Sequence, residues 1–327
     1  MMKAKKAHWL GALVFVCCLV ATTAAPAQTY PRKNITIIVT AAAGGVSDVV
    51  ARAIGQRLTE AWGQQVVIEN KGGAGHIIGA QTVAKAAPDG HTLLLAEAGN
   101  FVLNPILFSK ERLSYDPDKD LAPITGLVRV NQALIANNGL AANNLGELIE
   151  LANKKPGEIT YGTAGVGSAP HVNMAKFENT ARVKLQAVHY RGAAPVLNDI
   201  MAGHINLMSV AYSLVVQPWA EKRLKVLAVG GDKPSPALPG VPVGASLGYE
   251  ANTWFGLATT GGTPPDVVAK ISAEVRKILS DPGFEQRFMA PQMFESIATS
   301  PEEFAANIKA EIPRWAKVIR EQNLVIE

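Results

Sequence analysis

The stretch over residues 35–48 constrains the fold of this chain more than any other. An apolar run, ITIIV, breaks there into a turn that contains Gly44 and Gly45 and leads to Ser47. Apolar residues then recur at helical spacing, at Val50, Ala53, Ile54, Leu58 and Ala61. This pattern predicts a strand, a glycine turn and a helix with one face buried against a sheet. The chain should therefore fold as an α/β protein.

This glycine turn could hold an anion. Gly44 and Gly45 permit backbone angles that other residues avoid, and they let a ligand approach the main chain closely. The free N–H groups at a helix start, together with the helix dipole, form an anion site. Ser47 or Asp48 could cap the helix, although an ionised Asp48 would repel an anion unless its oxygens accept from backbone N–H groups. A carboxylate site is our hypothesis, and an ordinary strand-to-helix turn is the alternative.

The N-terminus carries the pattern of a secretory signal peptide. Lysines at positions 3, 5 and 6 precede an apolar run over 9–20, and the small residues APA follow at 25–27. The run is shorter than the roughly 20 residues needed to cross a bilayer. We therefore predict a signal peptide over 1–27, cleaved after Ala27, and an exported mature protein.

Composition excludes several classes of function. Cys17 and Cys18 are the two cysteines of the chain, and both fall in the predicted signal peptide. The mature protein then has no thiol for a disulfide, a metal site or a nucleophile. Removing the three lysines takes the formal net charge from +4 to +1, which argues against a nucleic acid partner. The six histidines show no metal-ligand spacing on one helix face, so no metal is expected.

Strands and helices alternate along the chain. Strands are predicted at 35–39, 65–70, 92–96, 134–136, 158–161, 185–189, 205–209, 225–229 and 254–258. Helices are predicted at 145–153, 194–201, 214–220, 265–279 and 301–322, besides those that open after the glycine turns. Such alternation favours a parallel sheet, which binds ligands beyond the carboxyl ends of its strands. Three of these ends, Thr40, Asn70 and Glu97, should face one edge.

A second strand–turn–helix unit mirrors the first. The loop over 162–171 is rich in glycine and leads into a helix through Phe177. Ser168 is a natural N-cap of that helix, and Pro170 suits its first turn. Two glycine loops that could each hold an anion, one in each half of an exported chain, suggest a two-part receptor that closes on a small anion.

Other chemistry is weakly supported. Ser168 and His171 invite a serine hydrolase interpretation, but the pattern Gly-x-Ser-x-Gly is absent. Glycines over 73–79 resemble a dinucleotide-binding fingerprint, but they follow the second strand of the chain. No acidic residue that could bind a ribose ends the next strand, so no cofactor is expected. Nothing in the sequence brings the carboxylates Asp48 and Glu97 together for acid–base catalysis. Arg191 could meet a carboxylate, or could be an ordinary surface arginine.

Several segments of the chain are similar to one known family. The matching segments lie in order at 30–39, 44–52, 63–70, 84–94, 104–105, 115–117, 235–239, 254–257 and 262–265. Across essentially the whole mature chain they resemble the Bug-type periplasmic solute receptors of tripartite tricarboxylate transporters. The resemblance implies a receptor that binds a small organic carboxylate, passes it to membrane permease subunits and catalyses nothing. We expect it to act as a monomer in the periplasm, although a sensory role beside a membrane kinase would fit equally well.

The resemblance also implies a domain arrangement. We expect a two-lobed periplasmic binding protein (type II) fold, with two Rossmann-like domains joined by two crossover segments. Lobe 1 would comprise 28–127 and 228–327, and lobe 2 would comprise 128–227. The chain would cross between them near 125–130 and again near 225–230.

Two departures from the family pattern bear on the ligand. Alanines at 41–43 stand where the family's first loop usually carries a Phe and prolines, which should widen the pocket. Ser209 and Val210 stand where relatives commonly place an aspartate that can meet an amino group. An amino acid ligand thus becomes doubtful. We predict an aromatic mono- or dicarboxylate such as terephthalate, with an aliphatic di- or tricarboxylate such as citrate as the rival.

The sequence predicts one binding site, without catalytic or metal-binding residues. Its members are Thr40, Ala42, Ala43, Gly44, Gly45, Val46, Ser47, Asp48, Glu97, Thr163, Ala164, Gly165, Gly167, Ser168, His171, Arg191 and Ser209.

Overall fold

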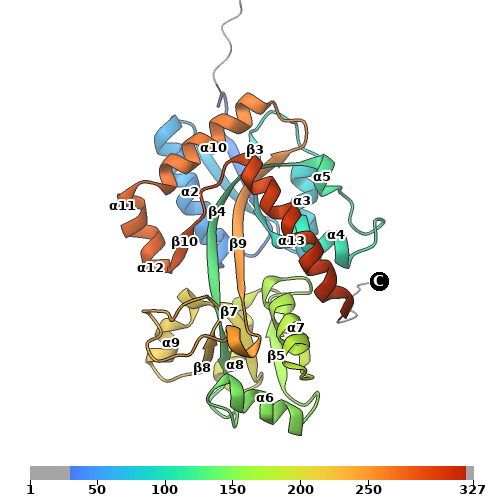
Figure 1. Cartoon of the computed structure of the whole chain (residues 1–327). Helices are drawn as coiled ribbons and strands as arrows, with labels where there is room; N and C mark the ends of the chain where they lie inside the picture. The colour runs from blue at the N-terminus through green and yellow to red at the C-terminus, as the bar shows by residue number, and fades with distance from the viewer. Residues whose placement is uncertain (1–29, 322–327) are drawn as a thin grey trace, which may run out of the picture. The chain divides into compact units, whose positions relative to one another are not determined.

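Strands and helices alternate through most of the computed structural model, which describes residues 30–321 (Figure 1). The predicted signal peptide over 1–27 and its cleavage after Ala27 lie outside the described residues. The fold below is that of the compact unit that begins at Lys33. Within residues 30–321, no helix has the length and apolar character that crossing a membrane requires.

The first lobe begins with three parallel strands. β1 (Ile35–Val39) pairs with both β2 (Val66–Asn70) and β3 (Thr92–Glu97). Helices α2 (Val46–Trp62) and α3 (Ile77–Ala84) connect them. β1 is buried along almost its whole length, as expected for a central strand with a continuous apolar run. The predicted first strand is confirmed residue for residue.

The second lobe repeats this plan. β5 (Thr160–Thr163) pairs in parallel with β6 (Gln186–His189) and β7 (Leu207–Ala211). The helices of this lobe are α6 (Leu145–Lys154), α7 (Ala169–Ala181), α8 (Ala193–Ala202) and α9 (Val216–Ala220). β8 (Lys225–Val229) has the bounds that the sequence predicted.

Two long antiparallel strands, β4 (Leu121–Ala136) and β9 (Asn252–Thr260), connect the two lobes. β4 pairs with β9 through Asn131 and with β7 from Gln132 onward. All the named strands thus form one ten-stranded sheet, ordered β2-β1-β3-β9-β4-β7-β5-β6, with β10 (Phe294–Ser296) and β8 both paired to β4. Figure 1 shows β4 and β9 running side by side from one group of helices to the other.

The first predicted crossover, near 125–130, falls inside β4. The sequence predicts a strand only over 134–136, but β4 runs unbroken through 121–136. Pro123 and Gly126 hide the strand pattern, and β4 pairs there across two register shifts in its ladder with β9.

The second predicted crossover falls inside β8. β8 pairs with the part of β4 that lies in the second lobe. Beyond it, Leu238 and Val241 pack in one core of that lobe, and Tyr249 packs in the other. We therefore propose that the chain returns to the first lobe at β9 rather than at 228.

The remaining short elements connect the longer ones. They are the 3-10 turns Ala74–His76, Tyr212–Leu214 and Ala245–Leu247, the π-helices Gly99–Leu103 and Glu285–Met289, and helices α4 (Asn104–Leu107), α5 (Pro117–Asp120), α11 (Pro282–Phe284) and α12 (Ala290–Gln292).

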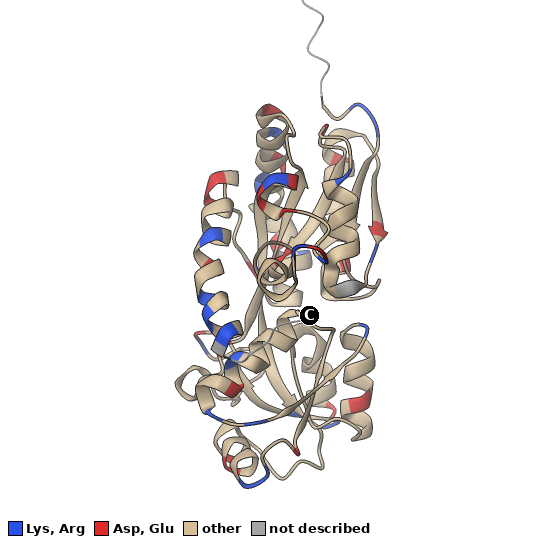
Figure 2. Ribbon diagram, turned by 90° about the vertical axis from the view of Figure 1, so that its right-hand side faces the viewer, with Lys and Arg blue, Asp and Glu red and all other residues tan. Residues whose placement is uncertain are grey.

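Two longer helices close the first lobe. They are α10 (Pro265–Leu279) and α13 (Pro301–Glu321). At the start of α13, Ser300 and Glu303 each accept a hydrogen bond from the other's backbone N–H, which is a capping box. Figure 2 shows acidic residues at the start of α13 and basic ones toward its end, as the helix dipole favours.

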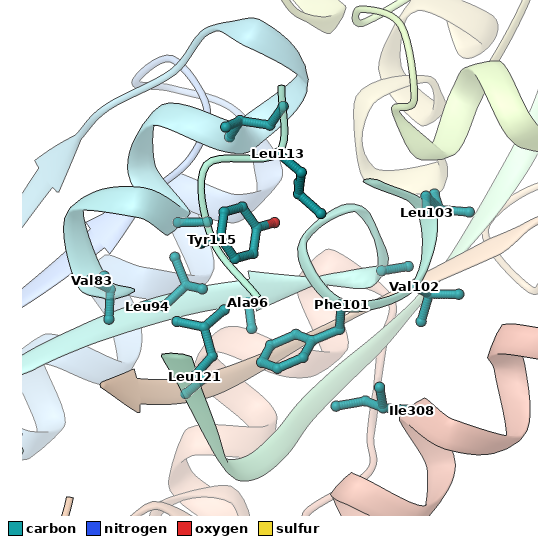
Figure 3. Packing of buried hydrophobic residues seen from close by; sticks show 14 of the residues in the cluster. Val83, Leu94, Ala96, Phe101, Val102, Leu103, Leu113, Tyr115, Leu121 and Ile308 are labelled. Carbon is teal, nitrogen blue, oxygen red and sulfur yellow. The ribbon is translucent and has the colours of Figure 1, made fainter. Parts of the chain in front are cut away.

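The core of the first lobe fixes the end of β3. In Figure 3 the ring of Phe101 points into the space between Leu121 and Ile308, and all three belong to one buried cluster. Because Phe101 lies in the π-helix that follows β3, this packing anchors the strand end that carries Glu97. The backbone N–H of Glu97 also donates to Asn100 at 3.0 Å.

Candidate functional site

The two predicted glycine loops line one cavity. Its volume is about 350 Å³, within the range of roughly 300 to 1,000 Å³ that small-molecule sites occupy. Residues 41–47 line it from the first lobe, and Ala164 and Ser168 line it from the second. The segment 191–195, which leads into α8, completes the second-lobe wall. Three helix starts, those of α2, α7 and α8, therefore meet at one cavity.

The first loop differs in detail from the prediction. Gly44 has φ +82°, which favours glycine. Gly45 has φ −81° and ψ 172° and occupies the N-cap position of α2, so the expectation that Gly45 needs special angles is wrong. Ser47 and Asp48 do not cap the helix, because Gly45 already fills that position and both lie in the first turn. No side chain caps α2, and its first N–H groups remain available to a ligand.

Asp48 points back onto the loop instead of into the cavity. Its Oδ2 accepts from the Gly44 N–H and from Arg52 Nε, both at 3.0 Å. Burial acts to raise the pKa of Asp48, but the hydrogen bonds from Arg52 and Gly44 outweigh it and hold the pKa below its ordinary value. The charge of Asp48 is therefore compensated by Arg52. Asp48 is also not among the residues that line the cavity, so an anion bound at the start of α2 would not face its carboxylate.

Beside the first loop lies a cluster that sequence reasoning found only in part. Glu97 Oε1 accepts from Thr40 Oγ1 at 2.9 Å and lies 3.0 Å from His76 Nδ1. Burial alone would lower the pKa of His76 and raise that of Glu97, but the opposite charges outweigh burial in both. The pKa of His76 is raised and that of Glu97 is lowered. His76 and Glu97 line the cavity, and Thr40 lies behind them.

The second loop is held by its own side chains. Ser168 is the N-cap of α7, as predicted, but its Oγ donates to Gly165 O at 2.7 Å instead of capping. His171 Nδ1 accepts from the Gly167 N–H at 3.1 Å. Burial, together with neighbouring His189, lowers the pKa of His171 to about 4. Near neutral pH this imidazole is uncharged and acts as an acceptor.

The third loop was predicted only at Arg191. β6 ends at His189, Gly192 has φ +118°, and α8 begins at Ala193 without a side-chain cap. The signal was present, because this is again a strand, a glycine and a helix. Arg191 is exposed, lines the cavity, and makes no ion pair within residues 30–321. It is the one lysine or arginine among the described lining residues.

The predicted site residues divide into two groups. Those that line the cavity are Ala42, Ala43, Gly44, Gly45, Val46, Ser47, Glu97, Ala164, Ser168 and Arg191. Those that do not are Thr40, Asp48, Thr163, Gly165, Gly167, His171 and Ser209. Most of the second group hold lining residues in place. Ser209 Oγ, for example, donates to Gln132 Oε1 at 2.7 Å, and Gln132 lines the cavity.

The apolar wall was not foreseen. Val130 and Phe255 line the cavity from β4 and β9, together with Leu197, Val210 and Leu214 from the second lobe. Side chains alternate along a strand, so their neighbours Arg129 and Trp254 line a different cleft on the other face of β4 and β9. Only the pairing of β4 with β9 determines which set faces the ligand cavity.

The arrangement is suited to holding an anion. Hydrolysis would need Ser168 activated by His171, but Ser168 Oγ donates to Gly165 and His171 accepts from Gly167. Among residues 30–321, no three His, Cys, Asp or Glu side chains gather where they could hold a metal ion. Helix N-termini and an unpaired guanidinium are features of carboxylate binding.

The chain is similar in sequence and in fold to several known proteins. Residues 50–324 match the model of the tripartite tricarboxylate transporter family receptor. Protein BugT of Bordetella pertussis is 31% identical, over 95% of this chain and 96% of its own. The structure of R. palustris Rpa4515 with adipate superposes with a TM-score of 0.84 at 30% identity, over 90% of this chain and 99% of that one. The periplasmic binding protein BugD gives a TM-score of 0.82 at 33% identity, over 91% and 100%. The two-lobed periplasmic binding protein fold is thereby confirmed.

Proposed function

This chain belongs to the tripartite tricarboxylate transporter receptor family, as a Bug-type receptor, and we propose that it captures a small organic carboxylate for a membrane transporter. We propose further that the signal peptide over 1–27 directs it to the periplasm, where it acts as a monomer and passes its ligand to permease subunits. The family and its solved relatives are binding receptors rather than enzymes.

One observation carries the proposal. Three helix starts and the unpaired guanidinium of Arg191 lie around a single cavity. Each helix N-terminus acts as about half a positive charge, so with Arg191 the cavity offers roughly two and a half. His76 and Glu97 cancel each other, as do Arg52 and Asp48. This positive charge suits a ligand with more than one carboxylate, whether a dianion or a trianion such as citrate.

For the ligand we propose an aromatic mono- or dicarboxylate, with terephthalate as the leading candidate. The apolar wall supports a ligand with an apolar body, and Phe255 offers a ring for it to pack against. The alanines at 41–43 line the cavity and take up little of it. An aliphatic dicarboxylate remains the rival, because the related Rpa4515 has been solved with adipate.

The test is a ligand panel on the mature protein. Terephthalate, phthalate, benzoate, adipate, malate and citrate would be compared by thermal shift and calorimetry. A ligand at about 100 times its Kd adds about 2.7 kcal/mol to stability, which is several degrees for a protein of this type. We expect a shift with at least one acid, and no shift with any of them would contradict the proposal.

A pair of arginine variants locates the binding. Arg191→Met should weaken the bound acid at least about tenfold, because it removes a charged hydrogen-bond donor. Arg223→Met is the matched control, since Arg223 is also exposed but pairs with Glu221 away from the cavity. Equal affinities in the two variants would place the acid elsewhere.

A further inference from the structure

His76 has a backbone conformation that is rare for its residue type. Its φ is +73° and its ψ is 4°, which is the left-handed region, at the N-cap of α3. Residues other than glycine seldom occupy this region, although histidine, asparagine and aspartate are enriched there. Such a conformation persists only where the surroundings impose it, and it is typical of functional sites. His76 is one of the residues that line the ligand cavity.

Only one nitrogen of the His76 ring is available to a ligand. Nδ1 lies 3.0 Å from Glu97 Oε1, 3.1 Å from Thr40 Oγ1 and 3.2 Å from Thr40 O. Since Thr40 Oγ1 gives its own proton to Glu97, all three neighbours can accept from Nδ1. Nδ1 therefore carries a proton in either charge state of the ring. Any bond to a ligand falls to Nε2, which accepts in the neutral ring and donates in the protonated one.

We propose that His76 is the specificity-determining residue for a second carboxylate: Nε2–H donates to that group, while Glu97 and Thr40 hold the ring through Nδ1. The inference rests on the proposed function and deepens it, because it makes the ligand a dicarboxylate. One carboxylate binds the second-lobe wall with Arg191 and the starts of α7 and α8, and the other binds His76 in the first lobe.

Glu97 acts as a positioning residue that keeps the ring charged. Glu97, from the end of β3, is the charged group in contact with His76, and Arg191 is the charged group on the opposite wall. Thr40 and Gly99, which also lie beside the ring, carry no charge. Burial would lower the pKa of His76, but Glu97 outweighs it and raises the pKa above the ordinary 6.5. The protonated ring donates a charge-assisted hydrogen bond, which a carboxylate accepts best.

Matched acids separate this role from general anion binding. Calorimetry would compare terephthalate with benzoate and adipate with hexanoate, pairs whose members differ mainly by one carboxylate. His76→Asn keeps a residue that tolerates left-handed angles and removes the ring. We expect its affinity for the dicarboxylate that binds the wild type to fall between about tenfold and a hundredfold. Affinity for the matching monocarboxylate should change less than about threefold, because its bonds to Arg191 and the helix starts are untouched.

Two further variants keep the test decisive. Glu97→Gln retains the shape of the side chain but removes its charge, so it should weaken the dicarboxylate selectively. His204→Asn is the matched control, because that ring is 71% exposed and lies outside the cavity. It should bind like the wild type. If His76→Asn weakens both acids of a pair equally, or leaves the dicarboxylate unchanged, the inference is overturned while the receptor proposal stands. If no acid binds the wild type, the receptor proposal itself fails.

The dependence of ligand affinity on pH distinguishes a binding role of His76 from a purely structural one. Dicarboxylate affinity should fall as pH rises through the raised pKa of His76. Monocarboxylate affinity should stay level over the same range. In Glu97→Gln the fall should begin at lower pH, because the partner charge that raises the pKa of His76 is gone. Parallel profiles for the two acids would contradict the role assigned to Nε2.

Discussion

The two predicted glycine loops are held in the same way by chemically different side chains. In the first, the Gly44 N–H donates to Asp48, and in the second, the Gly167 N–H donates to His171, four residues later in both cases. The first acceptor is a carboxylate neutralised by Arg52, and the second is a buried, uncharged imidazole. The backbone thus needs only an acceptor at this position. Which acceptor is present decides the pH range over which the loop is held.

The largest expected effect tests how tightly each loop is packed. A Cβ added at Gly167 would lie 3.1 Å from Leu107 Cδ1, whereas one at Gly44 would meet nothing within 4 Å. Both glycines have positive φ, +75° and +82°, which costs another residue roughly 1 to 2 kcal/mol. Gly167→Ala should therefore destabilise by about 2 to 4 kcal/mol and Gly44→Ala by about 1 to 2 kcal/mol. Urea unfolding measures the loss of stability in both variants, and equal losses would contradict the inference that the second loop is packed more tightly than the first.

Acid should weaken the second loop before the first. The pKa of His171 is about 4 in the folded protein against an ordinary 6.5, so stability falls as pH falls from 6.5 toward 4. The loss by pH 4.5 should be about 2 to 3 kcal/mol. Asp48, whose pKa lies below its ordinary 3.8, contributes nothing in this range. His189 adds to the same slope, because burial lowers its pKa too.

The His76–Glu97 pair should not contribute to the change in stability between pH 6.5 and 4.5. The pKa of His76 is raised, so its stabilisation is complete below 6.5, and that of Glu97 is lowered, so its stabilisation is complete above 4.5. Between those values the pair adds no slope. His171→Gln keeps a neutral acceptor at every pH and should reduce the slope of stability between pH 6.5 and 4.5 to the part that comes from His189. An unchanged slope in that variant would show that His171 is not its source.

Removing the acceptor from each loop should distinguish the charged acceptor, Asp48, from the neutral one, His171. Asp48→Ala and His171→Ala each leave a glycine N–H without its partner, which costs about 1 to 3 kcal/mol. Only the Asp48 interaction includes an ion pair, with Arg52. The loss in Asp48→Ala should therefore shrink in about 1 M salt, where the Debye length is about 3 Å, and the loss in His171→Ala should not. Unfolding at low and high salt compares them.

The smallest expected effect concerns the two serines of the loops. Ser168 Oγ donates to Gly165 O at 2.7 Å, whereas no side-chain cap bond joins Ser47 to the start of α2. Ser168→Ala should lower stability by about 0.5 to 1.5 kcal/mol, and Ser47→Ala should change it by less than about 0.5 kcal/mol. Neither variant should alter turnover of an activated ester. Turnover that disappears in Ser168→Ala would instead support the hydrolase interpretation.

Much of the local structure could be read directly from the chain. β1, β8 and α10 have the predicted bounds, and Ser168 is the N-cap of α7. The expectation that strand ends gather at one edge also holds, because Thr40 donates to Glu97. These features depend on neighbours within a few residues, through side-chain periodicity and turn chemistry. The sequence carries that information locally.

What the sequence by itself determined is therefore the alternation of strands and helices, the glycine turns and the family resemblance. The tertiary structure alone decided that β4 runs unbroken between the lobes and that its residues Val130 and Gln132 face the cavity. It also decided that His76 meets Glu97 from another strand, which sets the directions of their pKa shifts. Burial and electrostatic pairing depend on residues that are distant in the chain, and no local pattern records which of them will meet.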